Sequence, residues 1–169
     1  MKNRWLCSVL AAIFSAMLFT TSASAAELNS ADALKELKVG KVVWDITAAN
    51  PTNLLNYLKI IQKTYEALAQ QKVTLDMVLV FRGDAVKLIT VEHTHDHAAM
   101  EQHTEKVETT ALLAELQDKP GVKMEVCGMA MTLFNIENNH IFPGIKPVEN
   151  SFISLIGYHT QGYATIPIN

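Results

Sequence analysis

The chain has 169 residues, with 14 basic and 17 acidic side chains and a net charge of −3 when the histidines are neutral. This length fits one domain with a sizeable core. A mildly acidic sequence without basic runs gives no electrostatic reason to expect nucleic acid or an anionic membrane as a partner.

Residues 1–25 have the order of a secretory signal peptide. Two basic residues precede an apolar stretch (5–19), and a polar step then leads to Ala-Ser-Ala at 23–25. This order predicts cleavage before Ala26 and export to the periplasm. The apolar stretch is shorter than the roughly 20 residues that a membrane-spanning helix needs. We therefore expect a mature protein, 26–169, that is one domain with no membrane segment.

Short apolar segments with the length of strands recur along the expected mature chain. The segment at 76–81 is nearly continuous in apolar residues, as a strand covered on both faces should be. In the last segment, Pro167 favours a position at a sheet edge. The expected strands are 41–46, 76–81, 122–127, 145–148 and 164–168.

Helical patterns separate these strands. Asn50 followed by Pro51 is typical of a helix start, and apolar residues then recur at three- and four-residue spacing. We expect further helices around Leu112–Leu116, at 129–136, and from a cap at Ser151. Strands alternating with helices predict an α/β fold with a five-stranded, mostly parallel sheet covered by helices on both faces. The segment 85–90 fits either a helix or a strand, and Gly162 is the expected stop of the last helix.

Chemistry in an open parallel sheet collects at the carboxyl ends of the strands. In this chain those ends carry residues 48–50, 82–84, 127–128 and 150–151. Cys127 is the only cysteine of the expected mature chain, so it falls where this architecture places its sites.

Cys127 has no partner for a disulfide, although exported proteins normally pair their cysteines. It is either a buried inert thiol or a reactive thiolate, and its position alone favours neither. A thiolate at the start of a helix is stabilised by unpaired N–H groups of the first turn. Gly128 would allow the tight turn into that helix, and Arg82 could add positive charge.

Four sequence segments, in order, resemble the DsrE/DsrF-like sulfur-relay family. The resemblance extends from Val42 to Ile168 and implies a flavodoxin-like three-layer sandwich that assembles as a homo-oligomer, a trimer or a hexamer. The segments are Val-Leu-Val-Phe-Arg-Gly-Asp-Ala-Val (78–86), Gly-Val-Lys-Met-Glu-Val-Cys-Gly-Met-Ala (121–130), Phe-Pro-Gly-Ile-Lys-Pro-Val (142–148) and Gly-Tyr-Ala-Thr-Ile-Pro-Ile (162–168).

The resemblance also implies an activity. Active members pass sulfane sulfur as a persulfide on a cysteine at the end of the third main strand, a position that Cys127 matches. We therefore expect an exported, sulfurtransferase-like carrier that takes sulfur from a donor and gives it to an acceptor thiol protein. Arg82, Gly128 and Asn150 are the expected binding residues around an anionic sulfur. No phosphate-binding loop or dinucleotide fingerprint indicates an organic cofactor.

A histidine-rich segment supports a different function. If it is helical, two of its histidines share one face with Glu101. If it is a loop, two could converge on zinc or copper beside Asp96. The favoured interpretation is a surface segment that binds metal loosely, because the signal is compositional. The alternative function is a periplasmic metal-binding or structural module with an inert Cys127. The candidate ligands are His93, His95, His97 and His103.

Overall fold

Five parallel strands form one sheet in the order β4-β3-β2-β1-β5. The structure is a computed structural model that describes residues 30–91 and 100–169, except for the side chains of 100–103. The chain divides into two units, Met1–Lys35 and Glu36–Asn169, and the sheet with its helices belongs to the second unit.

The strands confirm the expected α/β class, and every pairing between described strands is parallel. The first two begin two residues earlier than expected, because Val39 pairs with Thr74 ahead of the apolar segments. β5 lies at an edge of the sheet beside β1, the position that Pro167 favours. The strands are β1 (Val39–Ile46), β2 (Thr74–Phe81), β3 (Val122–Cys127), β4 (Lys146–Val148) and β5 (Ala164–Ile168).

The helices begin and end at recognisable signals. The Asn50 side chain accepts a hydrogen bond from the Asn53 N–H at 3.1 Å and so caps α1. In the described part of the chain, no helix is long and apolar enough to cross a membrane. The helices are α1 (Pro51–Gln70), α2 (Ala85–Leu88), α3 (Met100–Gln117), α4 (Gly128–Leu133), the short 3₁₀ helix η1 (Asn138–His140) and α5 (Ser151–Thr160).

Three helix boundaries differ from the expected ones. α3 begins at Met100, well before its leucines. α4 ends at Leu133, because Asn135 has a left-handed φ of 54° and stops the helix. The prediction that Ser151 caps α5 is wrong: Asn150 is the cap, and its side chain accepts a hydrogen bond from the Phe152 N–H at 3.0 Å. Gly162, with a φ of +85°, follows the end of α5 as expected.

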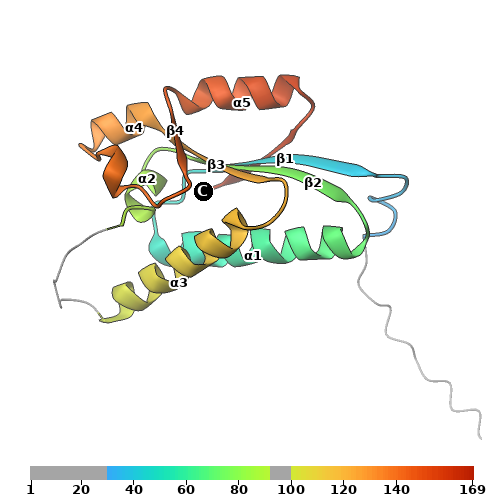
Figure 1. Cartoon of the computed structure of the whole chain (residues 1–169), viewed down its shortest axis with the longest axis horizontal. Helices are drawn as coiled ribbons and strands as arrows, with labels where there is room; N and C mark the ends of the chain where they lie inside the picture. Colours follow the sequence, from blue (N-terminus) through green and yellow to red (C-terminus); the bar gives the residue numbers. More distant parts are fainter. Residues whose placement is uncertain (1–29, 92–99) are drawn as a thin grey trace, which may run out of the picture. The chain divides into compact units, whose positions relative to one another are not determined.

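The two faces of the sheet are covered differently (Figure 1). α1 and α3 cover one face, and α5 lies on the other side. Alternate strand residues such as Ile46, Leu79 and Phe81 pack with the leucines of α1 and α3 in the main core. The strand residues that point to the opposite face belong to a much smaller cluster under α5. It consists of Val43, Val78, Val80 and Tyr163, with Leu155 and Tyr158 packed against it.

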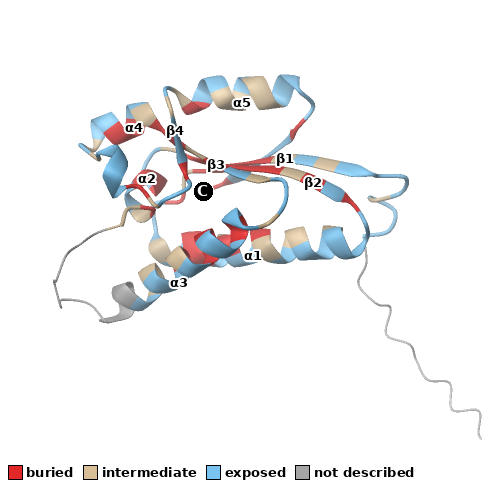
Figure 2. Ribbon diagram, viewed as in Figure 1, coloured by how far each residue is buried: buried red, intermediate tan, exposed pale blue. Residues whose placement is uncertain are grey.

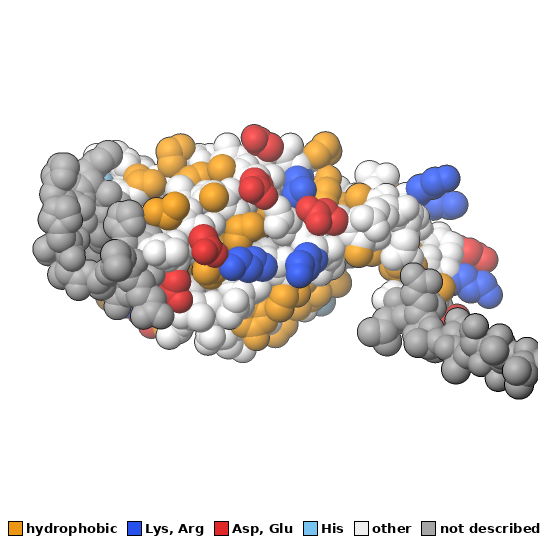
Figure 3. Space-filling view, turned by 90° about the horizontal axis from the view of Figure 1, so that it is seen from below, with side chains coloured by type: hydrophobic (Ala, Val, Ile, Leu, Met, Phe, Trp, Pro, Cys, Tyr) orange, Lys and Arg blue, Asp and Glu red, His pale blue; other side chains and the backbone are white. Residues whose placement is uncertain are grey.

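The outer side of α1 and α3 carries ion pairs among exposed apolar side chains such as Ile60 and Val107. Lys59 of α1 pairs with Glu108 of α3 at 2.8 Å, and Lys119, just after α3, pairs with Glu66 at 3.4 Å. Viewed from this side, acidic and basic side chains lie next to one another (Figure 3). α5 is mostly exposed or half-buried, and its buried residue lies at its start (Figure 2). That buried residue, Ser151, belongs to the candidate site.

Candidate functional site

Cys127 is the last residue of β3 and the residue before the first turn of α4. The residue is only 6% exposed, and it is a free cysteine. Val122, Met124 and Val126 belong to the core under α1 and α3. Strand alternation places Cys127 on the α5 face, where Ser151 at the start of α5 approaches its sulfur. Because it ends the strand, Cys127 also packs against the main core cluster.

Hydrogen-bond donors surround the sulfur. Burial raises the pKa of the Cys127 thiol, but the hydroxyl and N–H of Ser151 and the N–H groups of Ala130 and Met129 lower it. The net effect is a pKa below the ordinary value of a cysteine. These donors come from the first turns of α4 and α5, so segments far apart in the sequence build one thiolate-stabilising environment.

Ser151 is the donor that the sequence did not reveal. The residue is 1% exposed, and its Oγ makes no hydrogen bond with the described part of the chain. A buried hydroxyl without a partner is normally costly. The Ser151 hydroxyl lies close to the Cys127 sulfur and could donate a hydrogen bond to its thiolate, a bond that it does not make to the neutral thiol.

Gly128 allows α4 to approach the end of β4. A Cβ atom at this position would lie 2.8 Å from the carbonyl oxygen of Val148 and 3.4 Å from that of Glu149. The reason for the glycine is therefore close backbone packing. The left-handed conformations of the described glycines occur elsewhere, at positions such as Gly121. Any larger residue at 128 would push the first turn of α4, with its N–H groups, away from the end of β4.

Arg82 lies next to Cys127 across the sheet. Phe81 of β2 is opposite Val126 of β3. The next residues along the two strands, Arg82 and Cys127, are therefore opposite each other. Arg82 donates from Nε and Nη2 to the two carboxylate oxygens of Asp45 at 2.6 and 2.8 Å. The hydrogen bond to Asp45 is the main cause that raises the pKa of Arg82, and the charge of a Cys127 thiolate acts in the same direction.

Asp45 and Phe152 hold the guanidinium in place. Asp45 is 9% exposed and binds the group in the two-pronged geometry that a carboxylate and an arginine favour. The ring of Phe152 lies 5.2 Å from the guanidinium carbon. Arg82 therefore supplies a fixed positive group near the sulfur, with much of its charge offset by Asp45.

Asn150 and the histidine-rich segment are the remaining expected site residues. The oxygen of Asn150 caps α5, which positions Ser151, and a contact of Asn150 with an anion stays a prediction. The candidate ligands His93, His95 and His97 lie outside the described residues. His103 lies in α3, and its side chain is also outside the part of the chain that the structure describes. Among the described residues, no group of three or more histidine, cysteine or acidic side chains could hold a metal ion.

The fold and the site together define a class of protein: an α/β domain with a parallel five-stranded sheet and a buried, acidified thiol at a strand end. The DsrE/DsrF-like family model matches residues 11–168, and the chain belongs to this family. The fold is accordingly of the flavodoxin-like, sulfur-relay type.

A solved structure shows the same fold. The protein of unknown function MTH1491 from Methanobacterium thermoautotrophicum is 14% identical, with a TM-score of 0.58 over 76% of this chain and 98% of its own. A second similar structure, the ychN protein from E. coli, is 17% identical, with a TM-score of 0.46 over 78% of this chain and 97% of its own. None of the curated protein sequences matches this chain.

Proposed function

We propose that this protein is a periplasmic carrier of sulfane sulfur, which it holds as a persulfide on Cys127. The observation that supports this proposal most strongly is the set of donors around a buried sulfur: one hydroxyl and three N–H groups, which lower the thiol pKa. An inert core cysteine has no need of such donors, because its neutral thiol packs as a small apolar group. Membership of the DsrE/DsrF-like family supports the same chemistry.

The transfer is an exchange at sulfur. The Cys127 thiolate attacks the outer sulfur of a donor R–S–S–H, the Cys127 S–S bond forms, and the donor S–S bond breaks. The products are Cys127–S–S–H and the thiolate R–S⁻, so atoms and charge balance without an external oxidant or reductant. An acceptor thiolate then attacks the outer sulfur of the Cys127 persulfide and regenerates the Cys127 thiolate.

Each described group has a part in this exchange. The donors of Ser151, Ala130 and Met129 stabilise the attacking thiolate and, after transfer, the thiolate that leaves. Arg82, held by Asp45, offers positive charge to an anionic donor or persulfide. Burial of the sulfur keeps bulk water and large oxidants away from the carried persulfide.

Mass spectrometry of the Cys127 peptide tests this function. Brief treatment of the native protein with polysulfide should add one or more sulfur atoms at Cys127, and a thiol reductant should remove them. Cys127→Ser should take up no sulfur at this peptide. Ser151→Ala should load more slowly, because the thiolate loses one donor. A native protein whose Cys127 takes up sulfur only after denaturation would refute the carrier function.

The proposed carrier is a homo-oligomer, a trimer or a hexamer. Large apolar side chains are exposed on α4 and α5, the two helices beside Cys127, and Ile166 is exposed on the edge strand β5. Apolar surface of this kind is typical of an interface. The exposed residues of the two helices are Met129, Leu133, Phe152, Ile153 and Ile156.

A further inference from the structure

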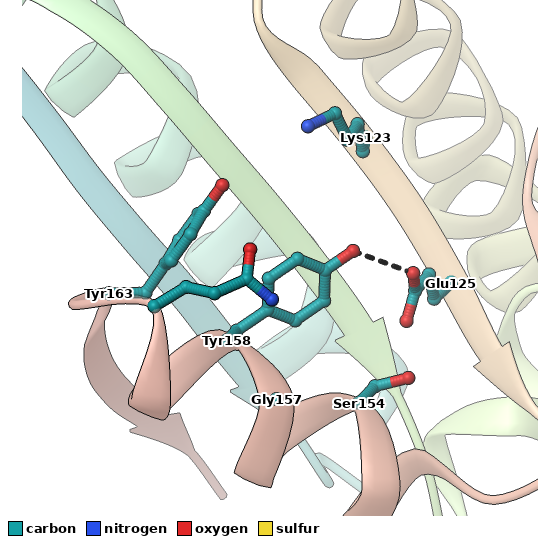
Figure 4. Close-up of a pocket in the computed structure, with 7 residues that line it drawn as sticks. Lys123, Glu125, Ser154, Gly157, Tyr158 and Tyr163 are labelled. Carbon is teal, nitrogen blue, oxygen red and sulfur yellow. Dashed lines mark hydrogen bonds between the residues drawn. The ribbon is translucent and has the colours of Figure 1, made fainter.

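A hollow of about 390 Å³ lies between β3 and α5. Lys123 and Glu125 line it from β3, and Ser154, Gly157 and Tyr158 line it from α5 (Figure 4). Lys123, Glu125 and Cys127 occupy alternate positions of one strand and so share its α5 face. Glu125 therefore lies two residues, roughly 7 Å, along β3 from Cys127.

Glu125 is the unusual group in this hollow. Its Oε1 accepts a hydrogen bond from the Tyr158 hydroxyl at 2.8 Å. Its Oε2 is buried and has no hydrogen-bond partner among the described residues, and no ion pair between them includes Glu125. A buried carboxylate oxygen without a donor is costly, so the site has an unmet requirement for a donor.

Asp76, on the same face, shows what a satisfied carboxylate looks like in this protein. Its Oδ2 accepts from the Tyr163 hydroxyl at 2.6 Å, and its Oδ1 lies 3.1 Å from the Lys123 ammonium. Each carboxylate therefore has a tyrosine on one oxygen, but only Asp76 has an ammonium on the other. By analogy, an ammonium group is the donor that Glu125 lacks.

The hollow has room for such a group. Gly157 faces it from the middle of α5, and a Cβ atom added there would meet only Gln161 Nε2, at 3.9 Å. Glycine is unfavourable inside a helix. At this position it leaves space in the hollow that Glu125 also lines.

We propose that this hollow binds the ammonium group of a low-molecular-weight amino persulfide, such as cysteine persulfide, which donates its outer sulfur to Cys127. This inference rests on the proposed carrier function. In cysteine persulfide, four bonds separate the nitrogen from the outer sulfur. An ammonium on Glu125 therefore directs the sulfur along β3 toward Cys127. Lys123, whose ammonium is half-exposed beside Asp76, complements the donor's carboxylate.

The transfer itself is the same exchange at sulfur. The Cys127 thiolate forms a bond to the outer sulfur, the S–S bond of cysteine persulfide breaks, and cysteine thiolate leaves while its ammonium is still bound to Glu125. Glu125 binds the donor and takes no part in the bond exchange. The negative charge passes from the Cys127 sulfur to the cysteine sulfur, and the proton stays on the transferred outer sulfur.

Sulfur loading of Cys127 from three donors tests the inference. The donors are cysteine persulfide, the persulfide of 3-mercaptopropionic acid, which lacks only the ammonium, and inorganic polysulfide. The native protein should load at least about tenfold faster from cysteine persulfide than from the analogue, as expected for a hydrogen bond to a charged group. Glu125→Gln should abolish this preference and leave loading from polysulfide unchanged. Glu108→Gln, on the outer side of α3, is the matched control and should keep the preference.

A second pair of variants tests the space itself. Gly157→Leu should fill the hollow and remove the preference, whereas Gly157→Ala should keep most of it. An unchanged preference in both Glu125→Gln and Gly157→Leu would overturn the amino-persulfide site, even if polysulfide still loads Cys127. Failure of every donor to load Cys127 in the native protein would instead refute the carrier function on which the inference rests.

Discussion

The two faces of the sheet differ in where their apolar and polar side chains lie. Under α1 and α3 the contacts are apolar, and the outer side of these helices carries ion pairs such as Lys59 with Glu108. Around α5 the arrangement is reversed: Ser151 and Tyr158 turn polar groups toward the sheet, while Ile153 and Ile156 are exposed.

This difference indicates that one face supplies most of the folding stability and the other carries the reactive groups. Each large apolar side chain buried under α1 and α3 contributes about 1.5–3 kcal/mol to folding. The α5 face has few such residues and instead carries a thiol of lowered pKa, an arginine–aspartate pair and a carboxylate oxygen without a donor among the described residues. Its polar groups are costly to bury, and that cost is offset by the apolar core on the other side.

The largest expected effect is a loss of stability from the α1 and α3 face. Leu58→Ala removes a fully buried side chain from α1 and should lower the free energy of unfolding by about 2–5 kcal/mol. Val43→Ala, under α5, should cost less, about 1.5 kcal/mol. Urea unfolding measures both. Equal losses would contradict the claim that one face supplies most of the stability.

The next effect contrasts two glycines of the α5 side. Gly128→Ala places a Cβ atom 2.8 Å from the Val148 oxygen and should cost about 1–3 kcal/mol as an overpacked contact. Gly157→Ala meets open space and should stabilise the helix, by up to about 1 kcal/mol. The midpoint temperature of thermal unfolding should fall for Gly128→Ala and rise for Gly157→Ala. Shifts in the same direction would show that it is not.

A smaller effect on folding, but a clear one on assembly, is expected from the outer side of α5. Ile153→Glu changes an exposed residue and should alter the free energy of unfolding of the subunit by no more than about 0.5 kcal/mol. If this surface joins subunits, light scattering should show at least a trimer for the native protein and smaller species for the variant. Lys63→Glu, on α1, is a control that should leave assembly intact. A native monomer at micromolar concentration would contradict the oligomer.

Much of the fold could be predicted because local signals and tertiary packing agree. Asn50-Pro51 and the apolar spacing after it indicated α1, and the alternating segment 122–127 matches β3 residue for residue. α3 was harder to delimit, because its first turns lack an apolar face. Its position depends on contacts with α1 such as Thr52 with Glu105 at 2.6 Å.

The site could be predicted only in outline. Parallel topology placed Cys127 and Arg82 at adjacent strand ends, as the sequence indicated. Ser151 was assigned to helix capping, because nothing local distinguishes a cap from a buried donor beside a distant sulfur. Asp45 had a usable signal, since a charged residue inside an apolar strand needs a partner when it is buried.

Glu125 is likewise a charged residue inside a strand, β3. Only the three-dimensional structure shows that its Oε2 has no hydrogen-bond partner among the described residues. Sequence periodicity gives the face on which a residue lies, but it gives neither the depth of burial nor the partners across the sheet. Those depend on how α5 packs against β3, where Gly157 and Ser154 line the hollow beside Glu125.

The ionisation of Cys127 decides whether its sulfur can act as a nucleophile, and the pH dependence of its alkylation measures that ionisation most directly. Because folding lowers this pKa, the thiolate should stabilise the native state above the unfolded pKa of about 8.5. This stabilisation should be lost as the pH falls through the folded pKa. Cys127→Ser should lack this pH-dependent contribution.

The measurement is the rate of iodoacetamide labelling at the Cys127 peptide of the native protein between pH 5 and 10. Burial slows the reaction at every pH, but the midpoint of the profile still reports the thiol pKa. We predict a midpoint below about 8.5, and a higher midpoint in Ser151→Ala, which lacks the hydroxyl donor. A native midpoint at or above about 8.5, or one that Ser151→Ala leaves unchanged, would contradict the account.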